Sequence, residues 1–107
     1  MGKYSVIMST FPSRKEANRI ADMLLKKRLI ACANIIPAVE SRYWWKSRIE
    51  KGKEALAVMK TRSSLASKVI VEIKKNHPYE VPEVIELPIL GGNGNYLKWI
   101  DEVTKKG

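Results

Sequence analysis

The segment from His77 to Glu83 (HPYEVPE) holds the densest group of side chains able to do chemistry: an imidazole, a phenol and two carboxylates. Pro78 and Pro82 fix their own φ angles and bias the residues before them toward extended backbone. In a polyproline II conformation, with three residues per turn, His77, Glu80 and Glu83 would share one side of the segment. Such a row could contact a metal ion or another ligand.

The spacing within this row limits what the segment can bind alone. A rise of about 3.1 Å per residue puts neighbours in the row about 9 Å apart. Ligands of one metal ion lie only about 3–4 Å from each other, since the bonds are about 2.0–2.2 Å long. The segment can therefore supply one or two ligands to a shared site, or bind a ligand between subunits. The alternative is a rigid connector in which Tyr79 packs and His77 caps a helix end.

The rest of the chain has no established catalytic motif. It contains one histidine and one cysteine, which excludes a closed zinc site within one subunit. No nucleotide-binding glycine fingerprint follows a strand, and Gly91–Gly94 is better explained as a turn. An acylphosphatase-like hydrolase would need an anion cradle, but no glycine-rich loop precedes Arg14. Cys32, among small and apolar residues, predicts a buried and inert thiol in a reducing compartment. We therefore expect that the protein is not an enzyme.

The formal charge of +9 suggests nucleic-acid binding, but the positions of the basic residues favour a solvated surface. Lys26–Arg28, Lys74–Lys75 and Lys105–Lys106 fall at expected helix C-termini, where cations complement the helix dipole. No nucleic-acid-binding motif accompanies them. No stretch of 18 apolar residues occurs, and the N-terminus lacks a signal-peptide pattern. We expect a cytoplasmic protein with no nucleic-acid or membrane partner.

Strands and helices alternate along the chain. Residues 4–9 are apolar and β-prone, which predicts a first strand. Ser13 stands three residues before Glu16, the spacing of a capping box. The apolar residues that follow have helical spacing: Ala17, Ile20, Ala21, Leu24 and Leu25. The sequence therefore predicts a strand and then a helix.

Residues 31–45 predict an unusually long strand, in which Pro37 indicates an edge or a bulge. Because successive side chains alternate, Tyr43, Trp44 and Trp45 place large aromatic rings on both faces. Local packing could bury one tryptophan and leave the other partly exposed. We favour burial of this arm by another subunit, since bare edges and exposed apolar patches are association sites.

A second strand–helix–strand unit is expected after the first. A charged turn through Gly52 is expected to lead into a central strand at residues 54–61. Ser63 or Ser64 can cap a second helix, which Pro78 stops. Together with the first half, this predicts two strand–helix–strand units.

The last elements complete the fold prediction. Residues 84–89 form a strand, which Pro88 places at an edge or end, and Asn95 caps a final helix. The order predicts an α+β, ferredoxin-like βαββαβ sandwich with an extra C-terminal helix. Its helices lie on one sheet face, so oligomerisation must cover the other.

Six collinear stretches cover nearly the whole chain: STFP (9–12), RLIACANIIP (28–37), SRYWW (41–45), MKTR (59–62), HPYEVPEVIELPI (77–89) and NYLKWI (95–100). Together they resemble the CutA family of divalent-cation tolerance proteins. The resemblance implies one domain over residues 1–107 and a tight homotrimer similar to PII signalling proteins. It also implies a non-enzymatic cytoplasmic role in tolerance to copper-type divalent ions. Many relatives carry glycine where this chain has Ser47.

Some bacterial members of the family look like they draw metal ligands from a cysteine in the first strand and from two histidines before the Pro-Tyr. At those positions this chain has Ser9, Asn76 and His77, so only one of the three ligands is present. His77 is therefore the predicted contact for a weakly bound Cu²⁺ or other divalent cation, and no cofactor is required. The alternative is a trimer that binds small molecules or proteins and has no physiological metal site. The predicted cleft between subunits combines His77 with Lys60, Tyr79, Glu83, Trp45 and Trp99.

Overall fold

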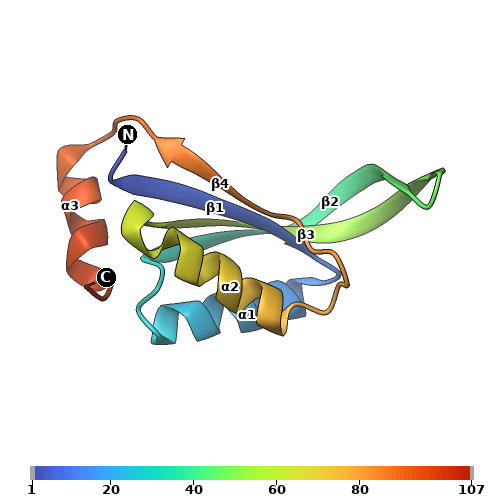
Figure 1. Ribbon diagram of the computed structural model, residues 1–107, viewed down its shortest axis with the longest axis horizontal. Helices are drawn as coiled ribbons and strands as arrows, with labels where there is room; N and C mark the ends of the chain where they lie inside the picture. Colours follow the sequence, from blue (N-terminus) through green and yellow to red (C-terminus); the bar gives the residue numbers. More distant parts are fainter. Residues whose placement is uncertain (1, 107) are drawn as a thin grey trace.

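The computed structural model describes residues 2–106, which form one four-stranded antiparallel sheet in the order β2-β3-β1-β4. Two helices, α1 and α2, cover one face of the sheet, and α3 lies at one end (Figure 1). This confirms the predicted α+β, ferredoxin-like arrangement with an extra C-terminal helix. The elements are β1 Tyr4–Phe11, α1 Arg14–Lys26, β2 Cys32–Trp45, β3 Arg48–Arg62, the 3₁₀ turn η1 Ser63–Leu65, α2 Ala66–Asn76, β4 Val84–Ile89 and α3 Gly94–Val103.

The core lies between the sheet and the two helices. Alternate residues of β1 and β3 face the helices, and Ile7, Phe11 and Met59 are fully buried there. The helices contribute the stripes that helical spacing predicts, including Ile20 of α1 and Ile73 of α2. Each such side chain contributes about 1.5–3 kcal/mol through burial.

The predicted N-cap of α1 is confirmed. The Ser13 hydroxyl accepts a hydrogen bond from the Glu16 backbone N–H at 3.2 Å. Arg19 pairs with Glu16 at 2.7 Å and also donates to the Asn76 carbonyl at 2.8 Å. The start of α1 is thereby joined to the end of α2, where the histidine-containing segment begins.

The β2–β3 hairpin corrects the predicted turn. Gly52 is not in a turn but lies inside β3, where it pairs with Ser41. The chain reverses at Lys46 and Ser47, whose φ angles are 50° and 66°. Two consecutive left-handed residues match the twist of a two-residue hairpin. Neither is glycine, so the usual sequence signal for this turn is missing, and β3 begins at Arg48 rather than at residue 54.

Two predicted caps and one predicted helix end were also misplaced. No side chain caps α2; Ser63 lies in η1, and its hydroxyl is 2.7 Å from that of Ser5. The Asn93 side chain, rather than that of Asn95, caps α3 by accepting from the Asn95 N–H at 2.9 Å. Lys105 lies beyond the end of α3, whose last turn holds no basic residue.

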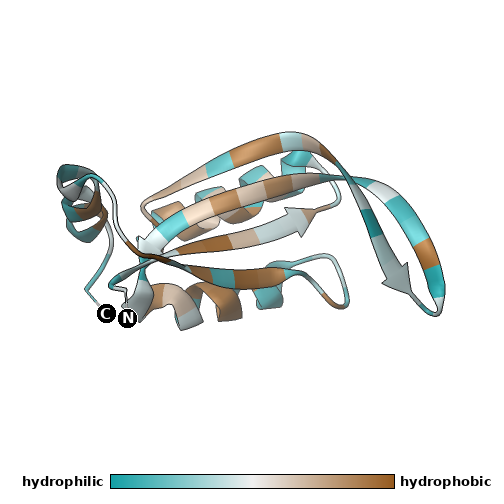
Figure 2. Cartoon of the chain, turned by 90° about the horizontal axis from the view of Figure 1, so that it is seen from above, coloured by the Kyte–Doolittle hydropathy of each residue, from teal (hydrophilic) through white to brown (hydrophobic). Residues whose placement is uncertain are grey.

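The second face of the sheet carries apolar side chains that no described segment covers. Figure 2 looks onto this face, with the helices behind the strands. Strand alternation and register place residues of all four strands here, and Ile36, Ile85 and Leu87 are 44%, 46% and 40% exposed. Such a contiguous apolar surface is typical of an interface.

The β2–β3 arm extends beyond the helical layer (Figure 1). Its register slips between Ile36 and Val39, beside Pro37, and β2 is an edge strand, as the proline predicts. On the arm, Trp44 is 71% and Ile49 is 65% exposed. Among the described residues, no helix is long and apolar enough to cross a membrane.

Candidate functional site

His77 is the C-cap residue of α2, and its ring is buried. Its Nδ1 accepts a hydrogen bond from the Tyr79 N–H at 3.1 Å, so the ring hydrogen sits on Nε2. Nε2 donates to the Thr10 carbonyl at 2.7 Å. The ring stacks on Phe11, with 4.5 Å between centroids and 15° between planes. These contacts match the predicted alternative in which His77 ends a helix and fixes a rigid connector.

The surroundings keep this imidazole neutral. Burial lowers the pKa of His77, and the hydrogen bond to the Thr10 carbonyl and the charge of Glu16 oppose this only in part. A proton on Nδ1 would also displace the N–H of Tyr79. His77 therefore stays neutral at pH 7, with both ring nitrogens bonded inside the chain.

Tyr79 connects the same segment to β3. Its hydroxyl donates to a carboxylate oxygen of Glu54 at 2.7 Å. Burial, followed by the hydrogen bond to Glu54, raises the pKa of Tyr79 well above its usual value. The phenol therefore remains protonated and acts as a hydrogen-bond donor.

The positions at which the resemblance implies metal ligands are each hydrogen-bonded within the chain. The Ser9 hydroxyl donates to the Glu83 carbonyl at 2.7 Å. The Asn76 side chain donates to the Glu72 carbonyl at 2.9 Å. Within residues 2–106, no group of three or more His, Cys, Asp or Glu side chains is placed to hold a metal ion. These residues do not fit a preformed metal centre in one subunit.

A cleft of about 770 Å³ opens between the β2–β3 arm and the segment after His77. Three predicted residues line it: Trp45, Tyr79 and Glu83. Aromatic rings and carboxylates together suit a cationic group, through charge and through contact with ring faces. The prediction missed several lining residues, which the register places here from separate parts of the chain: Thr10, Ser41, Arg42, Tyr43, Trp44, Glu54, Pro78, Glu80 and Val81.

Lys60 and Trp99 lie elsewhere within the subunit. Lys60 is six residues beyond Glu54 on β3, about 20 Å at roughly 3.3 Å per residue. Its ammonium group donates to the Asn34 side chain. Trp99 lies on α3 and packs against Tyr96 at 5.4 Å between centroids. A site that joins them to the cleft would need a second subunit, and it stays a prediction.

The thiol of Cys32 lies at this same end of the sheet. It is only partly buried, and its Sγ is 3.3 Å from the Tyr96 hydroxyl. The expectation of full burial was wrong because β2 is an edge strand whose outer face is bare.

Known proteins are similar to this chain in sequence and in fold. The sequence profile of the family described as CutA1 divalent ion tolerance protein matches residues 5–103. The chain is 43% identical to the divalent-cation tolerance protein CutA of Pyrococcus horikoshii, over 94% of this chain and 98% of that protein. It is 42% identical to the chloroplastic protein CutA 1 of Oryza sativa, over 94% of this chain and 57% of that protein. A crystal structure of CutA1 from Oryza sativa has a TM-score of 0.95 at 40% identity, covering 99% of this chain and 97% of that chain.

The extent of these matches differs among relatives. The chain spans little more than half the length of the plant and mouse relatives, at 55–59%. It spans nearly all of the archaeal protein. The profile match and the shared fold both extend over most of this chain, and the chain therefore belongs to the CutA1 divalent ion tolerance family.

Proposed function

We propose that this chain is a non-enzymatic, cytoplasmic homotrimer that acts in tolerance to copper-type divalent cations. The open sheet face supports the proposal that the chain assembles into an oligomer. Ile36, Ile85 and Leu87 are each at least 40% exposed there, and a second subunit would remove them from water. The family to which the chain belongs supports the role in cation tolerance.

The arm and the cleft support a closed ring rather than a two-fold dimer. On the arm, Ile49 is 65% exposed and does not line the cleft, whereas Trp44 is exposed and also lines it. If the arm of one subunit contacts the next subunit near its cleft, the contact joins two different surfaces. Head-to-tail contacts of this kind close into rings when the rotation allows. The two sheet edges, β2 and β4, are also available for pairing.

The proposed cation binding is weak and uses the cleft carboxylates. Glu80 and Glu83 are exposed, and both line the cleft. His77 could act as a ligand only by losing one of its two hydrogen bonds, because neither ring nitrogen has a free lone pair. Calorimetric titration of Cu²⁺ and Zn²⁺ into wild type, His77→Gln and the double variant Glu80→Gln/Glu83→Gln separates the two sets of ligands. Loss of affinity only in the double variant is expected, and loss only in His77→Gln would refute this assignment.

The second candidate is a regulatory trimer that binds a small molecule or a protein and has no physiological metal site. The hydrogen bonds at both nitrogens of His77 favour it. The same titration decides between the candidates. Equal and unsaturable Cu²⁺ binding by the wild type and both variants would support the regulatory trimer.

A further inference from the structure

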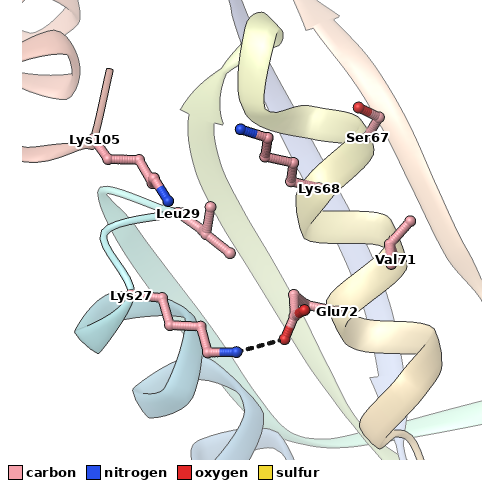
Figure 3. A pocket seen from close by; sticks show the side chains of 7 residues that line it. All are labelled: Lys27, Leu29, Ser67, Lys68, Val71, Glu72 and Lys105. Atoms are coloured by element: carbon pink, nitrogen blue, oxygen red, sulfur yellow. Dashed lines mark hydrogen bonds and ion pairs between the residues drawn. The ribbon is translucent and has the colours of Figure 1, made fainter. Parts of the chain in front are cut away.

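A second cleft, of about 590 Å³, lies on the helical side of the sheet (Figure 3). Three elements form it: the end of α1 with the turn after it, the first turns of α2, and the segment after α3. Leu29 is 4% exposed and lines its inner side, while Val71 is 53% exposed. The volume is within the range of small-molecule sites, about 300–1,000 Å³.

Three lysines line this cleft, Lys27, Lys68 and Lys105, together with one carboxylate, that of Glu72. Lys27 pairs with Glu72 at 2.8 Å, and Glu72 is also 3.7 Å from Lys75, outside the cleft. Within residues 2–106, no ion pair or side-chain hydrogen bond engages Lys68 or Lys105. In Figure 3 both side chains extend into the space between α2 and the C-terminal segment. The cleft therefore has an excess of positive charge.

The position of Lys68 adds to this excess. It lies in the first turn of α2, which follows η1 directly, and no acidic residue or side-chain cap is present in that turn. A cation at a helix N-terminus is unfavourable by itself, whereas an anion there is favoured. Ser67, in the same turn, adds a hydroxyl donor to the lining.

The C-terminal segment is fixed across from α2 rather than loosely attached. The Lys105 N–H donates to the Arg28 carbonyl at 2.8 Å. Arg28 donates in turn to the Val103 carbonyl at 3.1 Å, and Arg62 donates to the Thr104 hydroxyl at 2.9 Å. These bonds hold the Lys105 backbone opposite Lys68.

We propose that this cleft binds a small molecule carrying two or more phosphate groups. Lysine ammonium groups bind phosphate as point charges, and a group with several charges can contact Lys68 and Lys105 together. The apolar side chains of Leu29 and Val71 leave room beside them for an organic part. The site lies on the helical side, away from the open sheet face, so the inference goes beyond the proposed function and does not depend on trimer formation.

The test uses tripolyphosphate, pyrophosphate and orthophosphate as probes, titrated calorimetrically into the full chain near 0.15 M salt. The expected result is one saturable site per chain, with tripolyphosphate at least tenfold tighter than orthophosphate. Lys68→Gln/Lys105→Gln should weaken tripolyphosphate binding at least tenfold. Lys74→Gln/Lys98→Gln removes the same charge from exposed positions outside the cleft and should change affinity less than twofold.

Three results would overturn the proposal. One is the absence of saturable tripolyphosphate binding to the wild type at millimolar concentration. Another is an equal loss of affinity in both double variants, which would show that net charge alone attracts the probe. The third is a Lys68/Lys105-dependent affinity for a single-stranded oligonucleotide without one for tripolyphosphate. Because all four lysines are exposed, both double variants should keep the wild-type unfolding midpoint.

Discussion

Replacing His77 with alanine should strongly destabilise the fold, although the residue is the predicted metal contact. The change removes the ring that bonds the Thr10 carbonyl and the Tyr79 N–H. A polar group left without a partner in a buried place costs about 1–3 kcal/mol. The lost stack on Phe11 adds about 0.5–1.5 kcal/mol. With both groups left without a partner, these contributions add to an expected loss in free energy of unfolding of about 2.5–7.5 kcal/mol.

Guanidinium unfolding at one fixed protein concentration measures this loss, since the stability of an oligomer depends on concentration. Glu80→Ala is the matched control: it lies on the same segment but is exposed, and should change stability by about 0.5 kcal/mol or less. A loss under about 1 kcal/mol for His77→Ala would refute the structural role. So would wild-type stability combined with a large loss of Cu²⁺ affinity.

Three further predictions can be checked by unfolding experiments or by measuring the mass of the oligomer. Between about pH 7 and pH 5 the wild type should lose stability as the pH falls. Burial lowers the pKa of folded His77 below the ordinary 6.5, so the unfolded chain binds the proton first as the pH falls. His77→Gln should flatten this dependence of stability on pH. An unchanged dependence in the variant would contradict its assignment to His77. Leu87→Lys should shift the assembly toward monomer at micromolar concentration by placing a charge on the open sheet face, whereas Val71→Lys on the helical side should not. Ser47→Gly should raise stability by about 0.5–1 kcal/mol because glycine adopts a φ of 66° without strain, and a decrease would refute the turn assignment.

Local patterns predicted the order of elements. The capping spacing of Ser13 and Glu16 and the apolar stripe after it located α1, because both depend on neighbours in the chain. Pro37 likewise marked the irregularity in β2, since its ring removes a ladder donor. The predicted turn included Lys46 and Ser47 but extended through Gly52, because neither residue favours the left-handed backbone that the pairing of two long strands imposes there.

The candidate site was predicted less well because its contacts are long-range. The His77 ring bonds a carbonyl 67 positions away, and Tyr79 bonds Glu54 across 25 positions. The spacing of residues within 77–83 does not indicate which distant residues these side chains bond. Distances estimated along the segment could therefore exclude chelation of a metal by the segment alone, but they could not identify Thr10 and Glu54 as hydrogen-bond partners. Trp45, Tyr79 and Glu83, which were predicted to line a cleft between subunits, line one cleft of the single subunit, whereas the position of Lys60 on the far part of β3 follows from strand register.

The oligomeric mass of the wild type tests the central claim most directly. Light scattering on a size-exclusion column, at micromolar concentration near 0.15 M salt, should give about three times the chain mass of 12.2 kDa. That mass would agree with a closed ring that covers the open sheet face and the arm. A mass of one chain would contradict it, because Ile36, Ile85, Leu87 and Trp44 would then remain in water.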